Sequence, residues 1–224
     1  NIEPSFSYSK NKTIYSEDED SRDELNALTN QSTTNSEVET FGKNFSNDID
    51  ITKRFGSKGA FLKFSIENEI NANESTDFLN SETNIYGDNP ELIDRDQFTD
   101  GEKKVNNFRS YISYRLPLKA NEFFLEFRYN YSRNKQEDRK STYDKDENTS
   151  FYSNFNTDLS TDFKYINEAF TPSLRLEYQN KTWSARFDTR YIFRTLENID
   201  VLRPLLSLER DFEAVELRSR FRYK

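Results

Sequence analysis

The chain has 224 residues, of which 33% are hydrophobic and 32% charged, and its net charge is -8. Because an ordinary soluble domain carries roughly 45 to 50% apolar residues, we do not expect a conventional dry core across the whole chain. The absence of His and Cys excludes Ser-His-Asp and Cys-His catalysis and the usual zinc sites. The acidic balance disfavours a nucleic-acid partner. We therefore expect no enzyme, no metal site and no cofactor.

Apolar and polar residues alternate along about nine segments, and this period of two predicts β-strands. Several segments have close to the roughly 9 to 11 residues that a tilted membrane strand needs. No apolar run approaches the roughly 18 residues of a spanning helix. The predicted strands, in chain order, are centred on Phe6–Tyr8, Phe45–Phe55, Ala60–Ala72, Phe108–Leu118, Phe123–Tyr131, Leu174–Tyr178, Trp183–Phe193, Leu202–Leu208 and Val215–Tyr223.

The connections between these strands alternate in length. Short turns on one side and long loops on the other are typical of outer-membrane barrels, whose short turns lie in the periplasm and whose loops lie outside the cell. The short links are Gly56–Gly59, Pro117–Asn121, Gln179–Lys181 and Arg210–Glu213, and the long polar ones are residues 9–44, 73–104 and 132–158, with a briefer one near Glu197–Asp200.

One side of each predicted strand is apolar and the other is strongly charged. This pattern suits a barrel with lipid outside and a wet lumen inside better than a sheet with one face in water. We predict that Leu62, Phe64, Leu125, Phe127, Phe187 and Leu217 face lipid, whereas Lys63, Glu126, Arg186 and Arg218 point inward. Aromatic residues near strand ends, expected to form interfacial girdles, are Phe55, Phe61, Phe123, Phe124, Trp183, Tyr191, Phe193, Phe221 and Tyr223.

Several arginines on the predicted lumen side are candidates for a solute path. A guanidinium group binds a carboxylate or phosphate through two parallel hydrogen bonds, so a stripe of arginines suits an anionic solute. The same arginines could instead form structural ion ladders with neighbouring carboxylates, and both interpretations stay open. The candidate residues are Arg186, Arg190, Arg203, Arg218, Arg220 and Glu216.

These patterns predict an all-β, antiparallel up-and-down transmembrane barrel that occupies residues 1–224. An odd number of strands cannot close an all-antiparallel barrel, so we expect a segment of a larger barrel. The stretch Asp144–Asn148 matches the first oxygen positions of a calcium loop, but it lacks the turn glycine and the bidentate glutamate. We therefore interpret it as a solvated loop.

Two stretches carry a family resemblance. They are ITKRFGSKGAFLKFSIENEINANESTDFLNSET (Ile51–Thr83) and STDFKYINEAFTPSLRLEYQNKTWSARFDTRYIF (Ser160–Phe193). Their strand rhythm, basic-aromatic-Gly turn and Y-x-N-K-x-W turn resemble the TonB-dependent-receptor-like outer membrane β-barrel proteins of Bacteroidota. The resemblance implies a barrel of about 22 strands, within the known range for such barrels, normally preceded by a plug and a carboxypeptidase-regulatory-like domain.

The expected function follows from the barrel and the resemblance. We expect TonB-dependent uptake of a solute by the complete protein in the bacterial outer membrane. The expected partners are outer-membrane lipid and lipopolysaccharide, the remainder of the parent barrel, the plug, TonB and a surface lipoprotein. A first alternative is a barrel that serves as a scaffold in an outer-membrane complex with surface lipoproteins. A second alternative is a soluble β-rich surface adhesin.

Overall fold

The computed structural model describes residues 1–223, which form one antiparallel sheet of nine strands with almost no helix. None of these residues belongs to a helix long and apolar enough to cross a membrane. The elements are β1 (Ile2–Arg22), β2 (Leu28–Phe55), β3 (Ala60–Ile85), β4 (Glu91–Lys119), β5 (Phe123–Lys145), β6 (Tyr152–Phe155), β7 (Thr161–Gln179), β8 (Trp183–Asp200), the 3-10 turn η1 (Pro204–Leu206) and β9 (Leu208–Tyr223).

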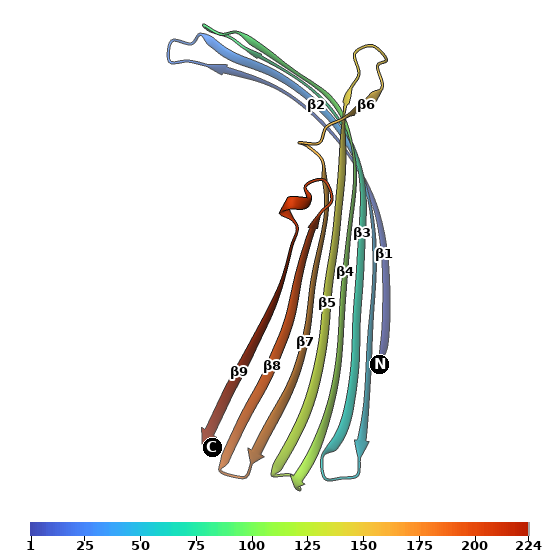
Figure 1. Cartoon of the computed structure of the whole chain (residues 1–224), viewed down its shortest axis with the longest axis vertical. Helices are drawn as coiled ribbons and strands as arrows, with labels where there is room; N and C mark the ends of the chain where they lie inside the picture. Colours follow the sequence, from blue (N-terminus) through green and yellow to red (C-terminus); the bar gives the residue numbers. More distant parts are fainter. Residues whose placement is uncertain (224) are drawn as a thin grey trace.

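The strands form a meander in the order β1-β2-β3-β4-β5-β7-β8-β9 (Figure 1). The short β6 pairs only with the end of β5, beyond the point where β7 begins. Without β6, eight long strands alternate in direction, so the edge strands β1 and β9 run antiparallel to each other. The argument from an odd number of strands is therefore wrong. Within residues 1–223, β1 and β9 are not paired and the sheet is open.

The region between β8 and β9 differs from the sequence prediction. Leu202–Leu208 is not a strand, because Pro204 lacks an N–H and starts the 3-10 turn η1. Arg210–Glu213 is not a turn but lies inside β9, where it pairs with β8. The short β6 was not predicted, since four residues are too few for a period of two to be detected.

The predicted long loops are mostly continuations of the strands. Residues 9–44 lie largely in the ladder between β1 and β2. This ladder runs without interruption from the pair of Ile2 and Ile49 to the pair of Ser21 and Asn30. Residues 73–104 and 132–158 likewise lie mostly in β3, β4, β5 and β6. Their Ser, Thr, Asn and acidic residues make both faces polar, which hides the strand period in the sequence. We call these extensions the arms (residues 10–43, 73–106, 132–168 and 194–214). In Figure 1 the ends of β1 to β4 bend away from the rest of the sheet.

Three short turns join the strands at the opposite end, where the sequence places them (Figure 1). Gly56 and Gly59 have φ angles of 63° and 90°, the left-handed region that glycine adopts without steric cost. Asn180 closes the β7–β8 turn, because its side-chain oxygen accepts hydrogen bonds from the backbone N–H groups of Thr182 and Trp183 at 2.8 and 2.6 Å. These turns set the register of the segments described below.

Candidate functional site: an apolar belt and an ionic face

The register assigns each side chain to one of two faces, since directly opposed residues of an antiparallel pair point to the same side. Leu62 opposes Tyr114, which opposes Phe127 in turn. Leu125 is linked to Phe187 through the intervening β7. The residues predicted to face lipid share this one face: Leu62, Phe64, Leu125, Phe127, Phe187 and Leu217.

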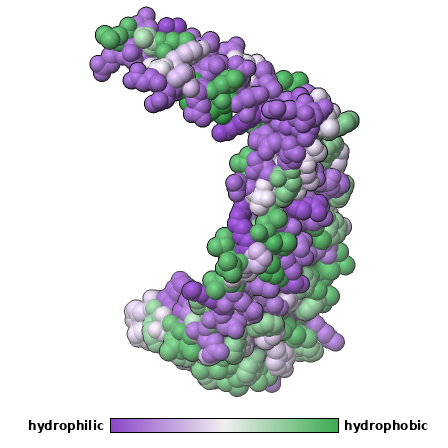
Figure 2. All heavy atoms as spheres, turned by 45° about the horizontal axis from the view of Figure 1, so that its top comes forward, coloured by the Kyte–Doolittle hydropathy of each residue, from purple (hydrophilic) through white to green (hydrophobic). Residues whose placement is uncertain are grey.

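We call the apolar part of this face the apolar belt. Its side chains are well exposed, as in Phe127 (51%) and Leu217 (65%). Figure 2 shows hydrophobic residues along the lower rim of an open crescent. Beyond the belt the same face becomes charged, with Glu74, Lys104 and Arg133 next in line. The belt comprises the outward residues of Ile2–Tyr8, Phe45–Ile51, Leu62–Ala72, Phe108–Leu116, Phe123–Tyr131, Phe170–Tyr178, Trp183–Phe193 and Val215–Tyr223.

Aromatic side chains mark both edges of the apolar belt. At the edge beside the short turns, the ring centroids of Trp183 and Tyr223 are 4.8 Å apart. At the opposite edge, Tyr131 stacks against Phe170 at 4.9 Å. Two residues predicted for such girdles, Phe61 and Phe124, lie on the other face instead. Each is adjacent in sequence to an outward-facing residue, so strand alternation points its side chain to the opposite face.

The opposite face, which we call the ionic face, centres on Glu126. This side chain is only 4% exposed, although the neighbouring Leu125 points to the belt. Arg128 donates two hydrogen bonds to the Glu126 carboxylate, from Nε to Oε1 at 2.6 Å and from Nη2 to Oε2 at 2.9 Å. The Ser113 hydroxyl donates a third at 2.7 Å. The buried carboxylate is thus held by a bidentate charged partner and a neutral one.

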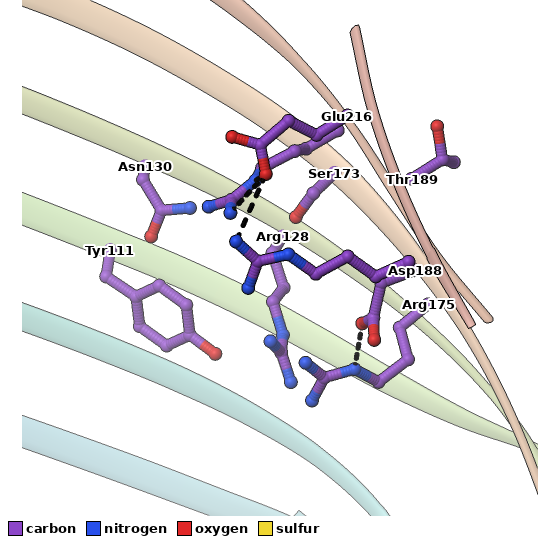
Figure 3. Close-up of a pocket in the computed structure, with 10 residues that line it drawn as sticks. Tyr111, Arg128, Asn130, Ser173, Arg175, Asp188, Thr189 and Glu216 are labelled. Carbon is purple, nitrogen blue, oxygen red and sulfur yellow. Dashed lines mark hydrogen bonds and ion pairs between the residues drawn. The ribbon is translucent and has the colours of Figure 1, made fainter. Parts of the chain in front are cut away.

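Ion pairs continue from Glu126 across β7, β8 and β9, and Figure 3 shows those at Asp188 and Glu216. The Nη1 of Arg175 lies 3.8 Å from Glu126, and its Nε donates to Asp188. Arg190 donates to Glu216 from both Nε and Nη2, at 2.9 and 2.6 Å. A hollow of about 160 Å³ is lined by Arg175, Asp188, Arg190 and Glu216, among others. The exposed fraction of the paired side chains increases from β7 to the edge strand β9, so the hollow opens to solvent at β9.

A second hollow, of about 190 Å³, lies nearer the short turns. Arg186, Arg220 and Arg222 line it together with a single acidic residue, Glu177. Glu177 is already shared, because Arg186 and Arg115 each place a guanidinium nitrogen 3.6 Å from its carboxylate. This part of the ionic face therefore contains more positive than negative charge.

The structure brings together most of the candidate path residues. Arg186, Arg190, Arg218, Arg220 and Glu216 occupy the ionic face of β8 and β9. Arg203 lies elsewhere, in the turn before η1, where it donates to the backbone oxygens of Thr157 and Ser160 at 3.1 and 3.3 Å. Arg203 does not share a face with the other arginines, because the break at Pro204 ends the strand alternation that grouped them.

Several residues of the first hollow were not singled out from the sequence, among them Tyr111, Arg128 and Arg175. Strand alternation was the available signal. Each of these residues stands next to a belt residue in its own strand, so its side chain points to the ionic face. Their grouping depends on which residues oppose one another across β4, β5 and β7, and no single-strand pattern contains that information.

A separate cluster of side chains lies on the arms. Tyr152 donates a hydrogen bond to Asp96 at 2.7 Å, and Lys145 donates to the same carboxylate at 2.6 Å. The hydrogen bond to Asp96 and partial burial raise the pKa of Tyr152 from 10.0 to about 12. Burial alone would raise the pKa of Asp96, but the hydrogen bonds from Lys145 and Tyr152 outweigh it and lower that pKa. Phe78 and Phe98 pack beside Tyr152.

The predicted solvated segment Asp144–Asn148 forms the end of β5 and a tight turn. The Asp146 carboxylate accepts hydrogen bonds from the backbone N–H groups of Asn148 and Thr149, both at 2.9 Å. These bonds lower the pKa of Asp146. In the part of the chain that the structure describes, no group of three or more His, Cys, Asp or Glu side chains is arranged to hold a metal ion.

The sequence matches no protein-family model, and no curated protein matches it at a significant level.

Proposed function

We propose that this chain forms part of the wall of a bacterial outer-membrane β-barrel that carries a solute across the membrane. The main support is the contrast between the apolar and the ionic face of the sheet. A one-layer sheet in water would bury its apolar side and expose its charges. Here Phe127 and Leu217 are exposed, whereas Glu126 and Ser113 are 4% and 1% exposed. Lipid on one side and an aqueous lumen on the other satisfy both faces.

The dimensions of the apolar belt support the same proposal. Trp183–Phe193 and Val215–Tyr223 approximate the 9 to 11 residues of a tilted membrane strand. Aromatic pairs stand at both edges, where Trp and Tyr favour the membrane interface. A soluble adhesin would leave this belt in water, which costs roughly 25 cal/mol for each Å² of apolar surface. We therefore favour the membrane wall over the adhesin.

Solute uptake is the activity that the ionic face supports best. Its arginines line two hollows on the side away from the belt, where a lumen would lie. We propose TonB-dependent uptake by the complete protein, in line with the family resemblance, with lipopolysaccharide, the rest of the barrel, a plug and TonB as partners.

A scaffold for surface lipoproteins is the second candidate, and the arms favour it. The β1–β2 ladder extends well beyond the belt, and both of its faces are polar there. Such an extension gives a large hydrogen-bonding surface outside the bilayer. An importer needs only the belt and lumen, so the two functions make different demands on the arms.

Cysteine labelling of intact cells tests the membrane topology. The chain has no native Cys, so single substitutions give unambiguous signals. We expect an impermeant thiol reagent to label Asn89→Cys and Asn148→Cys, in the turns of the arms, but not Ser57→Cys or Asn180→Cys, in the short turns. All four should react after lysis. The reverse pattern in intact cells would contradict the proposed orientation, and uniform labelling would contradict membrane insertion.

Shortening one arm separates uptake from scaffolding. In the register, Lys12 and Glu39 oppose each other, so an Asn-Gly turn can replace the residues between them without disturbing the belt. An importer should keep solute uptake in this variant. A scaffold should insert normally but lose its surface lipoprotein in a pull-down, and that result would favour the second candidate.

A further inference from the structure

Positive charge accumulates on the ionic face of β9. Arg218, Arg220 and Arg222 occupy alternate positions of this strand, so they point to the same side at intervals of roughly 7 Å. Arg218 pairs with Glu216, whose carboxylate Arg190 also holds. Within residues 1–223, neither Arg220 nor Arg222 has an ion-pair partner.

Two arginines also stand directly opposite each other on this face. Arg186 of β8 directly opposes Arg220 of β9 in the register. Like charges in directly opposed positions destabilise an antiparallel pair. The hollow that these two arginines line contains one acidic residue, Glu177, and the next acidic side chain on this face of β8 is Asp188, which opposes Arg218. Repulsion of this kind would be relieved by an anion bound to both guanidinium groups on the ionic face.

We propose that Arg186, Arg218, Arg220 and Arg222 bind a soluble polyanion with two or more phosphate or carboxylate groups. Arg218 lines the first hollow, whereas Arg186, Arg220 and Arg222 line the second. Two anionic groups of one ligand can therefore occupy neighbouring hollows. Each guanidinium offers a planar fork of donors that matches the oxygens of such a group.

This inference rests on the proposed function, because it names the chemical class of the solute. The arginines lie on the face opposite the apolar belt, since Leu217 and Phe221 alternate with them along β9. A lipid phosphate at the belt would therefore be on the wrong side of the sheet. A soluble polyanion in the lumen has direct access to Arg218, which is 69% exposed.

Titration calorimetry with inorganic tripolyphosphate tests the site, using the complete barrel protein in neutral detergent micelles. We expect saturable binding at low salt that weakens at least about tenfold near 1 M salt, where the Debye length is about 3 Å. Maltotriose, a neutral molecule, should not bind. The absence of saturable tripolyphosphate binding would overturn the inference.

Arg220→Gln provides the sharpest variant because its two expected effects have opposite signs. Loss of one charge-assisted contact should weaken tripolyphosphate binding by about tenfold. The ligand-free variant should melt at a higher temperature than the wild type, because the opposition to Arg186 is removed. A variant that merely damaged the fold would lower both quantities.

Arg109→Gln is the matched control. Arg109 lies on the ionic face of β4, is 73% exposed and pairs only loosely with Glu67 at 3.5 Å. Its replacement removes the same charge outside the site, and affinity should change by less than about twofold. Equal loss of affinity in Arg109→Gln and Arg220→Gln would contradict a local site.

Phosphatidylglycerol added to the micelles separates a lipid site from a soluble one. If the lipid abolished tripolyphosphate binding when both supplied the same concentration of negative charge, the arginines would bind lipid and the inference would be wrong. The labelling experiment is independent of these measurements. Binding with reversed labelling would retain the polyanion site and reject the proposed function, whereas correct labelling without binding would do the opposite.

Discussion

The apolar belt and the arms are built from the same strands but present opposite chemistry. On β5, the outward residues change from Leu125 and Phe127 to Arg133 and Glu137, while the ladder with β4 continues unbroken. Backbone pairing is therefore the same in both regions. The difference between them lies in the surroundings that the outward side chains require.

Ion pairs show the same contrast. In the belt region, the Glu126 side chain is buried and its partner Arg128 is mostly buried. On the arms, Lys12 and Glu37 also form a close pair, but their side chains are 44% and 43% exposed. Water screens the pair of Lys12 and Glu37, so this pair adds little stability. Removing one partner of the Glu126 and Arg128 pair leaves the other charge poorly solvated.

The largest expected effect tests this contrast between ion pairs. Glu126→Ala should lower the free energy of unfolding by about 3 to 5 kcal/mol, because Arg128 would keep a mostly buried charge without its carboxylate. Glu37→Ala on the arm should cost far less, because water screens its pair with Lys12. Urea unfolding in lipid vesicles measures both. Similar losses would mean that the two regions are equally solvated.

A slightly smaller effect tests the contrast between outward faces. Leu125→Arg should cost about 2 to 4 kcal/mol if this position lies near the bilayer midplane. Asn106→Arg, on the same face but beyond the belt, should stay within about 0.5 kcal/mol. Arg186→Leu on the ionic face should also be milder than Leu125→Arg. Equal damage in Leu125→Arg and Arg186→Leu would favour a soluble sandwich with two buried faces.

The smallest effect sharpens the description of the arms. Since the folded pKa of Tyr152 is raised from 10.0 to about 12, its contact with Asp96 should be fully formed below pH 10 and lost as the pH rises toward 12. Ultraviolet absorbance of tyrosinate, taken as the difference between the wild type and Tyr152→Phe, follows this ionisation. Asp96→Asn should move the transition to lower pH. An unchanged transition would show that Asp96 does not hold Tyr152.

Sequence reasoning worked best where one face is apolar. The even positions of Ala60–Ala72 and the odd positions of Trp183–Phe193 predict both strand and face, because side chains alternate with a period of two. The method failed on the arms, where both faces are polar and the period carries no contrast. It also failed at Leu202–Leu208, where a proline interrupts apolar residues that still fit the alternation.

The sequence by itself therefore determined the strands of the belt, their two faces and the three short turns with their Gly and Asn residues. Only the tertiary structure decided which charges meet. Arg186 opposes Arg220 because of the β8–β9 register, and Glu126 lies between Arg115 and Arg175 because of the pairing of three strands. A slip of one residue would send each of these side chains to the other face, so the ionic face exists only through the register.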